Sequence, residues 1–291
     1  MFLQQVVNGL TIGSTYSLVA IGFSMVFSVL ELTNFANGSF YMFGAYITVL
    51  TLSATGNFFV SMFISVLLTG ALGACMDRFA IRPIRKKNGP GIAAVISTIG
   101  VSQIINNSVL VFFGTETKLF PKVFNLGKFN INGVIITYLQ IIILCVALFL
   151  MVVLSIMVYK TKLGNAMRAT AQNVNAARLM GINVNMIITL TFFIGSMLAA
   201  IAGTLVGMYY ESVDVAMSGA ISMKTFAAAV LGGVGVLPGA MLGGILLGLV
   251  ETIVAGYISS GYRDAIAFAI LIIVLIFKPA GLLGKKIATK V

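Results

Sequence analysis

Long apolar runs separated by short polar segments dominate the chain. Nine runs can be traced, at 9–30, 39–54, 57–76, 91–113, 132–158, 186–209, 223–236, 238–258 and 263–277. A membrane-crossing helix takes about 20 residues, and most of the runs approach or exceed that length, whereas 39–54 and 223–236 are shorter. The runs are continuous, unlike the alternating segments of about 10 residues in a membrane β-barrel. The pattern predicts an all-α, polytopic membrane protein: about eight spanning helices and short broken or re-entrant segments, in a single domain over residues 1–291.

Two short, glycine-interrupted segments occur in the two halves of the chain. One is ELTNFANGSFYMFGAY at 31–46, and the other is KTFAAAVLGGVGVLPGAMLGG at 224–244. Paired broken segments in corresponding positions are typical of transporters with an internal repeat and a solute path near the repeat interface. Small residues four apart, such as Gly239 and Gly243, equally suit close helix packing. We therefore expect an internal repeat, while the path and packing interpretations of the glycines both stay open.

The basic residues indicate how the chain is oriented. It has 291 residues, of which 59% are hydrophobic and 9% charged, with a mean hydropathy of +1.09. Thirteen of the 18 Lys and Arg residues lie in 77–90, in 159–185 and after 277, so these segments should be cytoplasmic. The N-terminus is then inside if 39–54 is re-entrant and outside if it spans. Membrane orientation explains much of the net charge of +11. The charge therefore implies membrane lipid as a partner, and binding to nucleic acid is not needed to explain it.

Catalytic and metal-binding patterns are missing from the sequence. There is no His, and the two cysteines, Cys75 and Cys145, lie in apolar runs as small hydrophobes. The stretch GGVGVLPG at 232–239 lacks the Gly-Lys-Ser/Thr that would follow in a phosphate loop. The seven acidic residues are scattered rather than paired. The sequence thus predicts neither an enzyme nor a metal site.

One acidic residue lies well inside an apolar run. Glu251 is within 238–258, and intramembrane charges are functional candidates by default. Arg263, across the short turn that follows, is a candidate partner. An ion pair that fixes two helices is the simpler interpretation of Glu251, and a proton relay would need more such acids.

A candidate solute path combines the first broken segment with a polar stripe on the run 91–113. Residues four apart share one face of a helix, which aligns three short polar side chains of that run. The stripe either lines a path for a polar solute or bonds to a neighbouring helix. The candidate path residues are Thr33, Asn34, Asn37, Gly38, Thr98, Ser102 and Asn106.

The stretch GNAMRATAQNVNAARLMGINVN at 164–185 is polar between two apolar runs. Met167, Ala171, Val174, Ala177 and Gly181 recur at helical spacing, which predicts one amphipathic cytoplasmic helix over 164–181. Helices on membrane surfaces usually carry bulky apolar anchors and many lysines, whereas this face is small. Besides a surface helix, a connector or a solvated loop, docking onto a cytoplasmic protein is the interpretation we favour.

Part of this stretch resembles a known motif. NAARLMG, at 175–181, is similar to the Glu-Ala-Ala-x-x-x-Gly loop of ABC importer permeases, whose coupling helix contacts the ATPase. Ala176, Ala177 and Gly181 match, and Asn175 stands where Glu is usual. The resemblance implies a coupling role for Arg168, Asn175, Ala176, Ala177, Arg178 and Gly181.

Further stretches resemble one family within that class, the LivH-type permeases of branched-chain amino-acid importers. They cover nearly the whole chain in order: NGLTIGSTYSL, TNFANGSFYMFGAY, ATAQNVNAARLMGINV, TFAAAVLGGVGVLPGAMLGGILLGLVE and YRDAIAFAILIIVLIFKPAGLLG. Each motif is weak alone, and together they are specific.

The resemblance implies a bacterial inner-membrane importer for leucine, isoleucine and valine. Its other parts would be two cytoplasmic ABC ATPases, a second homologous permease and an extracytoplasmic solute-binding protein. ATP would be hydrolysed by the partners, and this chain would bind no cofactor. Alternatives are an importer of this class for urea, short amides or another small polar solute, an ATP-independent channel or secondary carrier, and a membrane scaffold.

Overall fold

A computed structural model describes residues 2–87, 89–121, 123, 127–131 and 133–284, and helices form most of it. The helices are α1 (Phe2–Leu30), α2 (Asn37–Thr55), α3 (Phe58–Met76), a π-helical turn (Asp77–Ile81), α4 (Arg82–Lys86), α5 (Gly91–Phe113), α6 (Tyr138–Lys160), α7 (Lys162–Gln172), α8 (Val174–Leu179), α9 (Val184–Tyr210), α10 (Met217–Gly232), α11 (Leu237–Tyr257), a 3₁₀ turn (Ser260–Tyr262) and α12 (Arg263–Phe277). Two small antiparallel pairs join β1 (Lys118–Leu119) to β4 (Ser212–Val213) and β2 (Lys128–Ile131) to β3 (Val134–Thr137).

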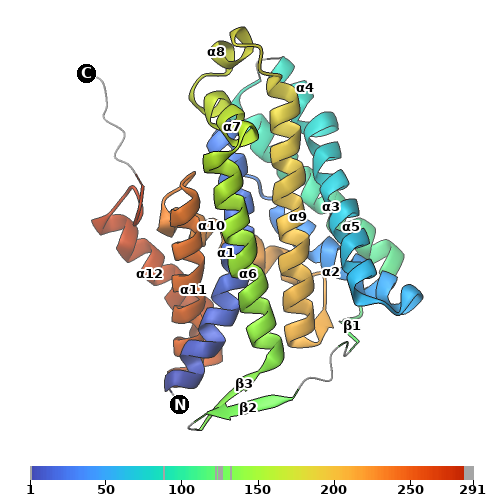
Figure 1. Cartoon of the computed structure of the whole chain (residues 1–291), viewed down its shortest axis with the longest axis vertical. Helices are drawn as coiled ribbons and strands as arrows, with labels where there is room; N and C mark the ends of the chain where they lie inside the picture. The colour runs from blue at the N-terminus through green and yellow to red at the C-terminus, as the bar shows by residue number, and fades with distance from the viewer. Residues whose placement is uncertain (1, 88, 122, 124–126, 132, 285–291) are drawn as a thin grey trace.

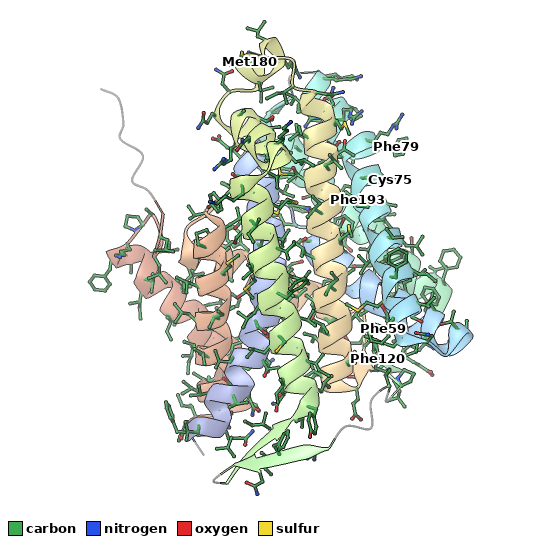
Figure 2. All side chains as sticks on the ribbon, in the orientation of Figure 1. Phe59, Cys75, Phe79, Phe120, Met180 and Phe193 are labelled. Carbon is green, nitrogen blue, oxygen red and sulfur yellow. The ribbon has the colours of Figure 1, made fainter. Side chains whose placement is uncertain are left out.

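Among the described residues, seven helical segments are long and apolar enough to cross a membrane, and α10 is a shorter apolar helix. This confirms the predicted all-α, polytopic architecture. Phe59 on α3 and Phe79 in the turn that follows are largely exposed and point away from the bundle (Figure 2). Such apolar side chains would contact membrane lipid, because the described helices leave most of their surface uncovered.

The two ends of the bundle differ in charge. The helices α4, α7 and α8, which contain most of the basic residues of 77–90 and 159–185, lie at one end, and the N-terminus and the β2–β3 hairpin lie at the other (Figure 1). The positive-inside rule makes the α7–α8 end cytoplasmic. The N-terminus is therefore outside, and residues 31–55 carry the chain from the cytoplasmic end of α1 back to the outer end.

Close approach of small residues joins the helices. A Cβ placed on Gly248 of α11 would overlap the backbone of Gly13 on α1. A Cβ on Gly203 of α9 would overlap the carbonyl oxygen of Tyr41 on α2, and Gly239 approaches Gly232 in the same way. Helices in lipid associate through such packing because water expulsion no longer drives them together. At these positions the packing interpretation of the glycines is correct.

An inverted repeat relates α1–α2 to α9–α10. Both long helices end at a glutamate with a left-handed backbone, φ 51° at Glu31 and 54° at Glu211, which is uncommon outside glycine. The next helix begins six residues later in each case, at Asn37 and at Met217. ELTNFA and ESVDVA share Glu, an Asn or Asp, and Ala in register, and α1 and α9 run in opposite directions (Figure 1).

The segment that corresponds to the first break is therefore 211–216, and the expected pairing with 224–244 is wrong. Glycines do not mark this second break, because a glutamate in a left-handed conformation ends the preceding helix. The glycines of 232–235 instead form the tight turn between α10 and α11, where Gly233 and Gly235 have φ of 114° and 79°.

Candidate functional site

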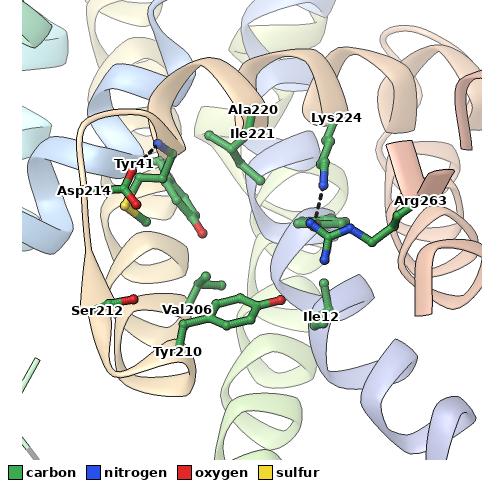
Figure 3. Close-up of a pocket in the computed structure, with 12 residues that line it drawn as sticks. Ile12, Tyr41, Val206, Tyr210, Ser212, Asp214, Ala220, Ile221, Lys224 and Arg263 are labelled. Atoms are coloured by element: carbon green, nitrogen blue, oxygen red, sulfur yellow. Dashed lines mark hydrogen bonds between the residues drawn. The ribbon is translucent and has the colours of Figure 1, made fainter. Parts of the chain in front are cut away.

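A polar cavity of about 290 Å³ lies between α1, α2, α9, α10 and α12 (Figure 3). The last turn of α9 and the first residue of α12 contribute to it, so it belongs to the end of the bundle opposite α7 and α8. Its lining mixes aliphatic, phenolic and charged side chains: Ile12, Tyr16, Tyr41, Val206, Tyr210, Ser212, Asp214, Met217, Ala220, Ile221, Lys224 and Arg263. We call it the outer pocket.

A buried charge cluster forms one side of the outer pocket. Lys224 Nζ lies 2.6 Å from Glu251 Oε1 and 3.0 Å from Asp264 Oδ1. The hydroxyl of Tyr16 donates to Glu251 Oε2 at 2.9 Å. The side chains of Lys224 and Glu251 are only 6% and 1% exposed, so each charge needs its partner to remain ionised. The cluster joins α1, α10, α11 and α12.

The sequence suggests Arg263 as the partner of Glu251. Arg263 does act on Glu251 electrostatically, but the close ion pair is made with Lys224 instead. Lys224 pairs with Glu251, while Arg263 Nε approaches Asp264 Oδ1 at 3.6 Å. The sequence held a usable signal, since Lys224 is the only basic residue between 186 and 258. A lone cation and a lone carboxylate in adjacent apolar runs are natural partners, because either alone is costly in a membrane.

The structure brings the two parts of the predicted solute path together. The backbone N–H of Phe35 donates to Thr98 Oγ1 at 3.2 Å, and the hydroxyls of Ser39 and Ser102 are 2.7 Å apart. The polar stripe of α5 thus bonds to the α1–α2 break and to the start of α2. These bonds join helices, which is one of the two roles expected for the stripe.

The remaining path candidates are mostly buried against the protein. Asn34 Oδ1 accepts from the N–H of Ala36, and the amide of Asn37 donates to the carbonyl of Val19 in the middle of α1. A Cβ on Gly38 would overlap Ser218 and Ser222 of α10. Thr33 is half-buried, and Asn106 has a buried Oδ1 without a hydrogen-bond partner in the described chain. None of the seven candidates lines the outer pocket, so their role in transport stays a prediction.

The predicted helix over 164–181 is two helices. Asn173 is extended, with φ −159° and ψ 109°, and it separates α7 from α8. Its side chain accepts from the N–H groups of Asn175 and Ala176 and so caps α8. An asparagine competes with the helix for its own backbone donors, which is the reason that the single-helix prediction fails. Gly181 follows α8 with φ 80°, a conformation that favours glycine.

The small-residue face of this segment points into the protein. Met167 and Ala177 are buried, whereas Asn175, Ala176 and Arg178 are exposed. Arg168 bonds within its own segment, to Asn165 Oδ1 at 2.5 Å, and lies over the ring of Tyr159. The small face that the sequence assigns to a partner is therefore partly covered by this subunit itself, at Met167 and Ala177, whereas Gly181 of the same face is exposed. Two residues it did not consider, Leu179 and Met180, are the most exposed apolar side chains there.

A second buried carboxylate fixes the cytoplasmic end. Asp77 lies 3.4 Å from Arg82 Nη2 and 3.7 Å from Arg85 Nη2, and it accepts from Thr189 Oγ1 at 2.5 Å. Arg85 also donates to Asn185 Oδ1 at 3.1 Å. This network ties the turn after α3 to the first residues of α9. Because α8 connects directly to α9, the network also sets where α8 projects.

A bundle of spanning helices, a polar pocket within it and an exposed cytoplasmic helix define a membrane transport subunit. The profile of the family described as "Branched-chain amino acid transport system / permease component" matches residues 5–275. The chain belongs to this family, as a multi-pass membrane permease whose ATP is hydrolysed by partner ATPase subunits.

Relatives extend this similarity over the full length. The high-affinity branched-chain amino acid transport system permease protein BraD of Pseudomonas aeruginosa is 41% identical, over 100% of this chain and 98% of its own. The corresponding protein LivH of Escherichia coli K12 is 39% identical over the same shares. A probable LivH of Methanocaldococcus jannaschii is 26% identical over 92% of this chain and 88% of its own. No solved structure matches the chain.

Proposed function

We propose that the chain is the permease subunit of an ATP-driven, binding-protein-dependent importer for leucine, isoleucine and valine. The observation that carries this is the full-length similarity to permeases whose names specify branched-chain amino acids. Two cytoplasmic ABC ATPases, a second homologous permease and an extracytoplasmic solute-binding protein complete the transporter. ATP-driven closure of the ATPases acts on α7 and α8 and reorients the bundle.

Contact with an ATPase is supported by the tip of α8. Leu179 is 89% exposed and Met180 81% exposed, at the end of the molecule that carries the basic segments (Figure 2). Burying such side chains is favourable in proportion to the apolar area removed from water. We infer that Leu179 and Met180 enter a groove of the ATPase, while the buried Ala177 lets α8 pack closely on its own subunit.

A second permease subunit is supported by the exposed face of α5. Gln103 and Asn107 are exposed near the middle of this membrane helix. Asn107 donates one hydrogen bond to the carbonyl of Gln103 at 2.8 Å. Each polar group left unpaired in hydrocarbon costs about 2–7 kcal/mol, so lipid is a poor neighbour for the remaining amide groups of this face. A homologous permease, or water held between two permeases, would supply hydrogen bonds there.

Reconstitution tests the proposal directly. Liposomes that contain this chain, its partner permease and the ATPases, with binding protein outside and ATP inside, should accumulate leucine. Omitting the ATPases should abolish accumulation. Leucine uptake driven by a proton or sodium gradient without ATPases would make the chain a secondary carrier. Uptake of urea but not leucine would assign a different solute within the same class.

The docking of α8 has its own test. Leu179→Asp should reduce co-purification of the ATPases at least tenfold, because a carboxylate cannot be buried in an apolar groove without a partner. Leu119→Asp is the matched control, since Leu119 is 80% exposed at the opposite end of the bundle. Equal recovery of the ATPases with both variants would contradict the docking.

A further inference from the structure

We propose that the outer pocket binds the transported α-amino acid, with its carboxylate toward Arg263 and its ammonium toward Asp214. This inference rests on the proposed function and deepens it by assigning a solute site within one subunit. It differs from the path that the sequence suggested, which follows α2 and α5.

Charges of opposite sign occupy opposite sides of the outer pocket. Arg263 reaches in from α12, and Asp214 lies across the cavity before α10 (Figure 3). Arg263 meets Asp264 through Nε at 3.6 Å, and its side chain also hydrogen-bonds to Tyr210. A guanidinium has five N–H donors, so these two contacts leave donors for a solute carboxylate. Asp214 Oδ1 accepts from the N–H of Met217, and this is the only hydrogen bond of Asp214 in the described chain. This arrangement favours a dipolar solute over an ion of either sign.

Lys224 does not need a solute to balance its charge. Its ammonium already contacts Glu251, Asp264 and the hydroxyl of Tyr16, the last at 3.4 Å. We therefore assign Lys224 a positioning role, in which it holds the first turn of α12 through Asp264 and so places Arg263 at the pocket.

The rest of the lining suits a small branched side chain. Ile12, Val206 and Ile221 supply aliphatic contacts from three helices, and Tyr41 and Tyr210 place phenol groups between them (Figure 3). A hydroxyl can both donate and accept, so the phenols can replace water around either charged group of the solute. The volume of about 290 Å³ is just below the range for drug-sized ligand sites, roughly 300–1,000 Å³, as suits a solute as small as an amino acid.

Cysteine protection tests the site. Ala220 lines the outer pocket and is exposed, and Met223, one turn further along α10, is exposed and does not line it. In a background with Cys75→Ser and Cys145→Ser, Ala220→Cys and Met223→Cys would each be introduced into the complete transporter in lipid nanodiscs. A small water-soluble thiol reagent would then be applied with and without saturating L-leucine.

We expect leucine to slow labelling of Ala220→Cys at least fivefold and to leave Met223→Cys unchanged. Lysine and glutamate, which carry a net charge, should protect less. Unchanged labelling of Ala220→Cys, or equal slowing at both positions, would overturn the site. If wild-type liposomes accumulate leucine with ATP while Ala220→Cys is not protected, the site fails and the proposed function stands. If they do not accumulate leucine, the proposed function fails.

Filling the pocket gives a second, independent readout. Ala220→Phe should reduce leucine uptake at least tenfold, because the added ring occupies the cavity. Met223→Phe adds similar bulk outside the cavity and should retain uptake. Comparable uptake by the two variants would contradict solute binding in the outer pocket.

Discussion

Replacing Lys224 by methionine should destabilise the protein more than replacing Glu251 by glutamine. The substitution leaves Glu251, which is 1% exposed, without its cation at 2.6 Å, and it also removes the partner of Asp264 at 3.0 Å. Removing one member of a buried pair costs about 3–5 kcal/mol. Glu251→Gln should cost less, about 1–3 kcal/mol, because the amide still accepts from Tyr16 and Lys224 keeps Asp264.

Combining the changes tests whether the two residues act as a pair. Lys224→Met with Glu251→Leu removes both charges, and replacing a buried pair by apolar residues is often close to neutral. The double variant should therefore be more stable than the summed effects of Lys224→Met and Glu251→Leu, each measured singly, would predict, by about 1–3 kcal/mol. The remaining cost comes from the unpaired Tyr16 hydroxyl and from Asp264.

Thermal denaturation of the purified protein in detergent, followed by size-exclusion chromatography, measures these effects. Each kcal/mol shifts Tm by roughly 2–3 °C at this chain length, so Lys224→Met should lower Tm by roughly 6–15 °C. Lys160→Met is the control, since Lys160 is exposed at the end of α6. Additive losses in the double variant, or a Glu251→Gln variant less stable than Lys224→Met, would refute the pairing.

Two further predictions use the same denaturation measurement. Asp77→Ala should lower the free energy of unfolding by about 2–4 kcal/mol, because two partly buried arginines lose their counter-charge. Thr189→Val should lower it by only about 1 kcal/mol. Equal losses in the two variants would contradict a charge network. Gly203→Leu should prevent close packing of α9 on the carbonyl of Tyr41 and lower the yield of folded protein. Gly219→Leu is the control and should be tolerated, because nothing lies near a Cβ added there. A stable Gly203→Leu protein would contradict the packing.

The class of fold follows from the sequence alone. Length and continuity of the apolar runs depend only on local composition, so the spanning helices could be read from them. The basic segments likewise determined which end is cytoplasmic, because the bias of Lys and Arg is a property of the loops themselves. The order of motifs along the chain pointed to the permease family, which the full-length similarity then showed.

Which residues meet depends on how the helices pack, and this could not be predicted from the sequence. Lys224 and Glu251 are 27 positions apart, and their contact exists because α10 and α11 form a tight antiparallel pair. The outer pocket takes side chains from five helices, and no single helix reveals it. The hydropathy of 39–54 does not decide on which side of the membrane the N-terminus lies. The α1–α2 break decides it, because residues 31–55 return the chain to the outer end. An apolar helix surface can pack against lipid or against another helix. Its sequence therefore predicts that the helix enters the membrane, but not which helix lies beside it.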